Sequence, residues 1–309
     1  MGKLIFIYIR RIMVYFQILF NSLVTGCVLA LAAYGFSLVF KITRAFHLAQ
    51  AGIYVCGVYA YVLSISKLNG MIGLGEIGAF VFAVITAFIV AWLIEKFIYL
   101  PIHSQNGNDV LSLVGSLGAN TVLINLVAMS FGNEVKTIDS TWKIKTFEPL
   151  QGWIITNLQL IQLIVALLIF AVLFWLLNRS TQLLTFKAVA DNSDLAEVSG
   201  LNVKRIRLGA VFVGTFLTVV AGILRTYDVG IEPYSGIDIT LSAAVVAILT
   251  GRIGVWQTVG VAIILTLLQN LTEWFLSAQW REGLTFLILL LVMLWRTEGV
   301  LSYQLRKDT

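Results

Sequence analysis

Uncharged polar side chains interrupt the long apolar stretches of this 309-residue chain, and they are the groups there with hydrogen-bonding chemistry. Amides, hydroxyls and a neutral imidazole donate and accept hydrogen bonds without a fixed charge. A path lined by them suits a neutral or zwitterionic solute, although the same groups also hydrogen-bond between neighbouring membrane helices. The residues expected to line such a path are Asn21, Thr25, His47, Gln50, Asn125, Thr215 and Ser242.

Catalytic and metal-binding patterns are missing from the sequence. No Asp, Glu, Lys or Arg falls near the middle of a long apolar stretch, where proton-coupled carriers place ionisable relays. His47 and His103 are far apart, and Cys27 and Cys56 lie in apolar stretches, which favours buried thiols over a metal site or a disulfide. The chain also has no GxGxxG, Walker GxxxxGKS/T or GxSxG motif. We expect no enzyme activity and no cofactor in this chain, and an energy source in another protein.

The elements that position these residues are predicted to be membrane helices. Apolar residues make up 59% of the chain and charged residues 12%, which is about half the charge of a soluble domain. Crossing the hydrocarbon core takes about 20 apolar residues in a helix. The stretches that approach or exceed this length are 12–40, 45–66, 77–94, 110–133, 149–178, 208–224 and 253–272, with shorter runs at 239–251 and 283–295.

The predicted fold is therefore all-α, a polytopic transmembrane helical bundle of about eight to nine membrane segments. Residues 1–309 are expected to form a single domain, with five crossings in 12–178, a cytoplasmic loop at 179–207 and the remaining crossings in 208–296. Small residues four positions apart mark close helix contacts. Such ridges are Ala79, Ala83, Ala87 and Ala91; Ala210, Gly214, Thr218 and Gly222; and Ala243, Ala247 and Gly251.

Basic residues orient the chain, because positively charged loops stay in the cytoplasm. We place the linker 179–207 inside on this rule, so the net charge of +5 indicates orientation and no nucleic-acid partner is expected. Alternation puts Arg252 and the tail residues Arg296, Arg306 and Lys307 inside as well, provided that 239–251 crosses. The same count leaves the basic N-terminal residues Lys3, Arg10 and Arg11 outside, against the rule.

The linker carries the most specific pattern in the sequence. Asp191 or Ser193 can cap a helix start, Asp194 and Glu197 suit the positive end of that helix, and Gly200 suits a left-handed stop. The segment 186–202 is thus expected to form a compact knob of short helices. A rigid element of this shape can transmit a push from a soluble motor protein into the membrane bundle.

This linker resembles the coupling loop of branched-chain amino-acid ABC importer permeases. That loop has a basic residue and alanine, an acidic residue followed by Asn, a further alanine, and then Gly with an aliphatic residue. Its positions are filled here by Lys187, Ala188, Asp191, Asn192, Ala196, Gly200 and Leu201. Segments 21–41, 47–52, 114–132, 230–234 and 249–254 agree with the family in order, while His47, Gln50, Arg252 and Gln257 depart from its pattern.

The resemblance, which runs from about residue 17 to 300, implies a permease subunit of an ATP-driven importer in the bacterial inner membrane. It implies a small polar solute, with branched-chain amino acids expected. The implied partners are a second permease, identical or different, two ATPase subunits that bind ATP and Mg, and an external solute-binding protein. Two alternatives stay open: the same machinery for urea, short amides or a sugar, and a secondary carrier driven by an ion gradient.

Overall fold

The computed structural model describes residues 2–43, 46–68, 75–104, 109–138, 145–150, 153–179, 181–251 and 254–295. Within these ranges, seven helices are long and apolar enough to cross a membrane, and the shorter helices α11 and α13 accompany them. The predicted all-α polytopic bundle is therefore confirmed. The elements are α1 (Gly2–Thr43), α2 (Ala49–Leu63), η1 (Ser64–Leu68), α4 (Gly75–Ile94), η2 (Glu95–Tyr99), α5 (Leu100–Ser104), α6 (Asp109–Phe131), β1 (Thr146–Leu150), β2 (Trp153–Thr156), α7 (Asn157–Arg179), α8 (Thr181–Asp191), α9 (Ser193–Val198), α10 (Val203–Val229), α11 (Ser235–Thr250), α12 (Val255–Phe275) and α13 (Trp280–Trp295).

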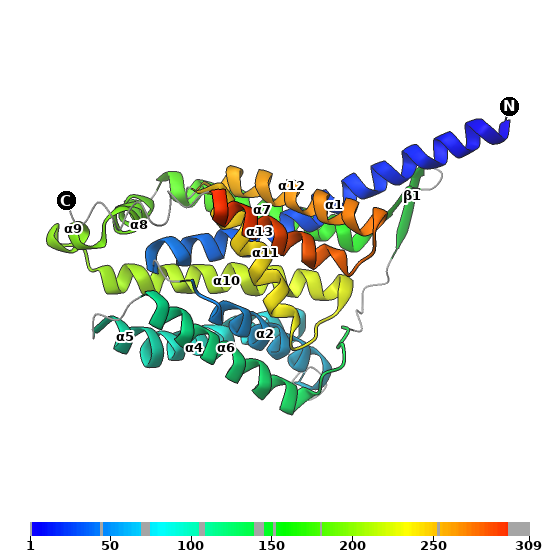
Figure 1. The fold of residues 1–309 in the computed structure, drawn as a ribbon. Coiled ribbons are helices and arrows are strands. Elements are labelled where there is room, and N and C mark those ends of the chain that lie inside the picture. The colour runs from blue at the N-terminus through cyan, green and yellow to red at the C-terminus, as the bar shows by residue number, and fades with distance from the viewer. Residues whose placement is uncertain are drawn as a thin grey trace.

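The two ends of the bundle carry different structures. Helices α8 and α9 of the predicted knob lie at one end, and strand β1 and the start of α1 lie at the other (Figure 1). This separation agrees with the prediction that 179–207 is cytoplasmic and the N-terminal residues are outside. The end with α8 and α9 is called the inner end, and the end with β1 is called the outer end.

Helix α1 is the centre of the bundle. Its apolar stretch is 83% buried within the protein, whereas that of α7 is 22% buried. Helices α10, α11 and α12 pack around it. Over its 42 residues α1 runs without a break, about 63 Å at 1.5 Å per residue. The basic N-terminal stretch therefore continues the same helix beyond the bundle (Figure 1).

Helices α1 and α10 approach each other closely through two glycines. A Cβ added to Gly35 would lie 2.7 Å from the carbonyl oxygen of Gly214, and one added to Gly214 would lie 2.8 Å from that of Gly35. The predicted ridge of Ala210, Gly214, Thr218 and Gly222 is buried throughout. Small residues allow this approach because no side chain separates the two backbones.

Helix α4 shows how the outer helices face the membrane. Its ridge of Ala79, Ala83, Ala87 and Ala91 is no more than 1% exposed and packs against the bundle. Ile77, Val81, Ile85 and Ile89 on the same helix are between 47% and 81% exposed. An apolar side chain is stable against lipid, so α4 turns its alanine stripe toward the bundle and leaves these larger apolar side chains on its outer face.

The predicted crossing at 149–178 starts too early, because its first residues form a β-hairpin. Strands β1 and β2 pair antiparallel, with Phe147 opposite Ile155, and α7 begins only at Asn157. A reciprocal pair of hydrogen bonds sets this start: Gln159 N donates to Thr156 Oγ1 at 3.2 Å, and Thr156 N donates to Gln159 Oε1 at 3.1 Å. This capping box satisfies amides that the first helical turn leaves unpaired.

Candidate solute cavity and coupling knob

The knob predicted at 186–202 is present as α8, Asn192 and α9. Leu195 N donates to Asn192 Oδ1 at 3.0 Å, so Asn192 caps α9 in place of the expected Asp191 or Ser193. Gly200 adopts φ +86°, the left-handed conformation expected at the end of this element. Its N–H donates to Glu197 O, and Leu201 N donates to Ala196 O, which closes the turn before α10.

One side of the knob packs against the inner ends of α1 and α10. Val189 and Ala196, 0% and 4% exposed, form a small core with Leu38, Ile42 and Ala210, and Leu201 packs beside it. The other residues matched to the coupling loop lie on the surface: Lys187, Ala188, Asp191, Asn192 and Gly200. Leu195 and Val198 of α9 are also 64% and 87% exposed. One face of the knob therefore packs against the bundle, and the opposite face is exposed and carries both apolar and charged side chains.

A cavity of about 640 Å³ lies toward the outer ends of α10, α11 and α13, with α1 and α12 closing it. This volume is within the range of small-molecule sites, about 300–1,000 Å³. Much of its wall is apolar, formed by Val28, Leu29, Ala32, Ala221, Val229, Ile239, Leu241, Val245, Phe286 and Leu289. Both Thr25 and Ser242, two of the predicted pathway residues, line it.

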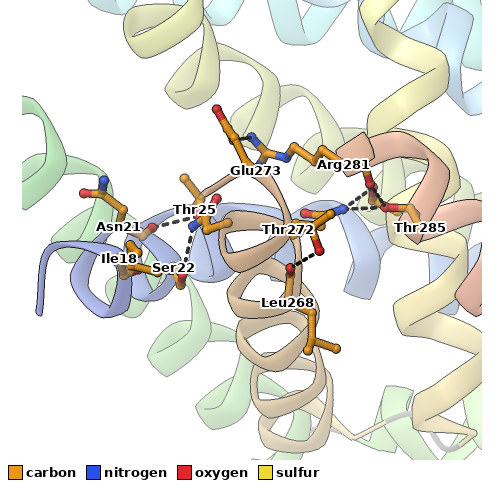
Figure 2. Close-up of polar contacts among 12 residues, drawn as sticks. Ile18, Asn21, Ser22, Thr25, Leu268, Thr272, Glu273, Arg281 and Thr285 are labelled. Carbon is orange, nitrogen blue, oxygen red and sulfur yellow. Dashed lines mark hydrogen bonds and ion pairs between the residues drawn. The ribbon is translucent and has the colours of Figure 1, made fainter. Parts of the chain in front are cut away.

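Charged side chains of both signs, from three helices, line this cavity. Helix α10 contributes Arg225 and Asp228, α11 contributes Asp238, and α13 contributes Arg281 and Glu282. Arg281 pairs with Glu273 at 3.6 Å (Figure 2). Arg225 interacts electrostatically with Asp228, Asp238 and Arg281. Among the described residues, however, no ion pair within 4 Å includes Arg225, Asp228 or Asp238.

Uncharged groups form a hydrogen-bonded patch in the same cavity. Gln269 Nε2 donates to Thr285 Oγ1 at 2.7 Å and to Ser242 Oγ at 3.3 Å, which links α12 to α13 and α11. Thr266 Oγ1 donates to Ser22 O at 2.9 Å and links α12 to α1. Thr285 lies beside Arg281 in Figure 2, and its hydroxyl also reaches the carbonyl of Arg281 at 3.1 Å.

The other predicted pathway residues lie away from this cavity. Asn21 Oδ1 accepts from Gln17 and Gln159, and Thr215 is buried within α10. His47 stacks on Tyr99, and Gln50 Nε2 donates to Thr218 Oγ1 at 2.6 Å. Asn125 is exposed on α6, where its amide donates to Thr121 O. The structure therefore brings only Thr25 and Ser242 of the seven together in the cavity.

A buried charged cluster at the inner end was not predicted. Glu95 of η2 and Arg207 of α10 form an ion pair of 2.8 Å with side chains 8% and 12% exposed. The Arg207 guanidinium lies 5.5 Å from the Tyr99 ring centroid, and Tyr99 in turn stacks on His47. The cluster joins η2, which continues α4, and the turn before α2 to α10, next to the knob.

Several sequence predictions concern parts that the structure leaves undescribed. Arg252, in the glycine-rich turn, and Arg296, Arg306 and Lys307 of the tail lie outside the described residues, as do the side chains of Lys3, Arg10, Arg11, His103 and Asp194. Within the described part of the chain, no group of three or more His, Cys, Asp or Glu side chains is placed to hold a metal ion. That the chain binds no cofactor stays a prediction.

The bundle of membrane helices with a knob at one end and a cavity toward the other defines a multi-pass membrane transport subunit. Residues 18–293 match the family described as the permease component of branched-chain amino acid transport systems, and the chain belongs to that family. It is a transmembrane permease, not a catalytic subunit. The predicted ABC importer permease is confirmed, and neither a secondary carrier nor a permease for a different solute is favoured.

Curated relatives match nearly the whole chain. The high-affinity branched-chain amino acid transport system permease protein LivH of Salmonella typhimurium is 26% identical over 303 residues, covering 95% of this chain and 97% of its own length. LivH of Escherichia coli K12 is 26% identical over 302 residues with the same coverage. BraD of Pseudomonas aeruginosa, named for the same transport system, is 27% identical over 301 residues, 93% of this chain and 96% of its own.

Proposed function

We propose that this chain is one of two permease subunits of an ATP-driven importer that carries branched-chain amino acids across the bacterial inner membrane. Two ATPase subunits would bind at the inner end, one of them on the knob of this chain. An external binding protein would deliver the solute to the outer end. The relatives' names support the solute. The observation that carries the proposal is that the knob and the cavity are built on the same two helices, α1 and α10.

Each of these helices contributes to both places. At the inner end, Leu38 and Ile42 of α1 and Ala210 of α10 contact the knob. Toward the outer end, Thr25 and Val28 of α1 and Arg225 of α10 line the cavity. Between them lies the tight contact of Gly35 with Gly214. Because packed helices shift as units and not by local yielding, a displacement of the knob moves both walls of the cavity.

The permease supplies no chemical step in this scheme. Its two arrangements, open outward and open inward, differ in stability by an amount that the ATPases bias through differential contact with the knob. The exposed apolar residues Leu195 and Val198, beside the charged Lys187 and Asp191, form the surface offered to those partners. Apolar groups bordered by charges are typical of a protein contact site.

Co-expression with the two ATPases and the binding protein, followed by reconstitution in vesicles, tests the proposal. We expect both ATPases to co-purify with the permease. We also expect uptake of radiolabelled leucine to require ATP on the side of the vesicle membrane where the ATPases are bound. The variant Val198→Asp should lose most of the co-purifying ATPase. Phe147→Asp is the matched control, since Phe147 is 51% exposed on the outer hairpin at the opposite end, and it should keep the ATPase bound.

Two results would contradict the proposal. One is leucine uptake by the permease alone, driven by an ion gradient without any ATPase. The other is a complete complex that hydrolyses ATP and transports urea or a sugar but no branched-chain amino acid.

A further inference from the structure

The charges of the outer cavity are not explained by the packing of the bundle. Arg225, Asp238 and Arg281 are 13 or more positions apart in sequence and belong to three helices, yet all three line one cavity. A charged group that is partly removed from water is costly unless it is paired, hydrated or functional. Among the described residues, Arg225, Asp228 and Asp238 have no ion pair within 4 Å. They are therefore suited to a ligand that brings its own opposite charges.

From this arrangement we propose that the outer cavity is a binding site for the α-amino and α-carboxylate groups of the solute. Arg225 and Arg281 hold the carboxylate, and Asp238 with Asp228 holds the ammonium group. The proposal rests on the proposed function and adds to it that the permease itself, and not only the delivering protein, selects for a zwitterion.

On the carboxylate side of the site, the Glu273 side chain pairs with Arg281 in the place proposed for the carboxylate of the solute. Arg281 contacts Glu273 at 3.6 Å, with the side chains 36% and 45% exposed (Figure 2). A partly exposed pair at this distance is weak. A solute carboxylate can therefore replace Glu273 at little cost, because a guanidinium binds a carboxylate through two parallel hydrogen bonds. Arg225 interacts electrostatically with Arg281 and adds a second positive charge on that side.

The ammonium side is formed by carboxylates on two helices. Asp238 lies in the first turn of α11, and Asp228 lies near the end of α10. Both interact electrostatically with Arg225. The cavity therefore carries charges of both signs on three helices, and an α-amino acid is the smallest common solute that presents an ammonium and a carboxylate group on the same carbon atom.

The apolar wall accommodates the rest of the solute. Val28, Leu29, Val245, Phe286 and Leu289 come from α1, α11 and α13 and border the charged groups. Burying an aliphatic side chain against this wall removes apolar surface from water and favours binding. Urea and sugars have no charge to offer, so binding them would leave the cavity's ionic groups unpaired while covering them. This predicts selection against the uncharged solutes of the alternative function.

A set of leucine analogues tests the proposal directly. The permease is purified in lipid nanodiscs without ATP, and binding of radiolabelled leucine is measured in competition with 4-methylpentanoate, which lacks the ammonium group, and 3-methylbutylamine, which lacks the carboxylate. We expect each analogue to compete at least tenfold more weakly than leucine. Equal competition by either analogue overturns the proposal.

Charge-neutralising variants assign the two sides of the site. Arg281→Gln should abolish the preference for leucine over 3-methylbutylamine, and Asp238→Asn should abolish the preference for leucine over 4-methylpentanoate. Glu134→Gln, an exposed carboxylate after α6, is the control and should keep both preferences. Because each readout is a ratio measured on one protein sample, partial loss of folded protein does not alter it. Unchanged ratios in both cavity variants overturn the proposal.

The outcome separates this inference from the proposed function. If the complete importer transports leucine with ATP but the cavity variants transport and bind it as the wild type does, only the cavity site is wrong. If the complete wild-type importer does not transport leucine, the proposed function itself fails.

Discussion

Glu95 Oε1 and Arg207 Nε are 2.8 Å apart, in a buried ion pair that joins η2, the continuation of α4, to the start of α10. Arg207 is five residues after Asn202, the residue that caps α10, and α10 follows the knob directly. The pair therefore links the knob to α4 on the periphery of the bundle, on the side away from α1.

Glu95→Ala should destabilise the protein by about 3–5 kcal/mol, because it leaves the buried guanidinium of Arg207 without a counter-charge. Thermal unfolding in detergent measures the loss. The double variant Glu95→Leu with Arg207→Met removes both charges and should recover most of the stability. A single variant as stable as the wild type would show that the pair is solvated and not buried.

Gly35→Ala should separate α1 from α10 and destabilise the bundle by about 1–3 kcal/mol, since the added methyl group meets backbone atoms. Its Cβ would lie 2.7 Å from the carbonyl oxygen of Gly214, which cannot move without shifting the helix. The matched control is Gly118→Ala in α6, where an added Cβ has no neighbour within 4 Å. The control should be neutral or slightly stabilising, as judged by unfolding temperature. Equal effects of the two variants would contradict the close contact.

Gly200→Val should uncouple ATP hydrolysis from transport. Gly200 has φ +86°, where a residue with a side chain costs about 1–2 kcal/mol, and a β-branched one fits worst. The strain would reopen the turn between α9 and α10. Measured as ATP hydrolysed per leucine imported, the ratio should rise severalfold.

Gly132→Val is the control for this change, because Gly132 has φ +80° with no neighbouring atom within 4 Å of an added Cβ. It places the same strain at the end of α6, far from the knob, and should leave the coupling ratio unchanged. Gly200→Asn should restore most of the coupling, since Asn tolerates the left-handed conformation. Normal uptake by Gly200→Val would refute the coupling role of the knob.

Gln17→Ala should loosen the outer hairpin without melting the bundle. The Gln17 side chain donates to Ile154 O at 2.9 Å and accepts from Ile154 N at 3.0 Å, so it ties strand β2 to α1. Losing both bonds should cost about 0.5–1.5 kcal/mol each. Hydrogen exchange should increase in residues 153–156. Exchange in the part of α1 that follows Phe20 should stay as in the wild type. Unchanged exchange in 153–156 would show that Trp153, packed on Phe16 and Phe20, holds the hairpin alone.

Hydropathy predicted the helices well because a membrane span must be both long and apolar. The start of α7 was missed for a local reason: Ile154 and Ile155 are as apolar in a strand as in a helix, so the stretch 149–178 looked continuous. The Thr156 and Gln159 capping box was the signal in the sequence that marks the true start. The knob was predicted because capping residues and a left-handed glycine act within a few positions of each other.

Burial within the bundle was harder to predict than the spans themselves. Asn125 sits in an apolar stretch just as Thr215 does, yet Asn125 is exposed on α6 and Thr215 is buried in α10. A lipid-facing surface and a protein-facing surface have the same hydrophobicity, so the sequence pattern does not separate them. The small-residue ridges are the better guide, since they mark the face that touches a neighbouring helix.

The charged cavity escaped prediction because its residues lie at helix ends. Arg225, Asp238 and Arg281 are each unremarkable as residues at the border of an apolar stretch, where charges reach water. Only the packing of α10, α11 and α13 against one another brings them together. These ionisable groups therefore meet in a cavity at the ends of helices and not in the middle of a span.

The central position of α1 sets a constraint on assembly. This helix is made before α10, α11 and α12, the helices that enclose it. Until these helices are inserted, α1 is exposed to lipid or to a protein that assists insertion. The exposed groups include the side chains of Ser22 and Asn21 and the narrow surface at Gly35. The end of α1 at Thr43 and the start of α10 at Val203 are 160 positions apart. Biogenesis of this permease must therefore shelter α1 for at least that length of synthesis, and a chain cut short after α7 would leave its own core as its least protected part.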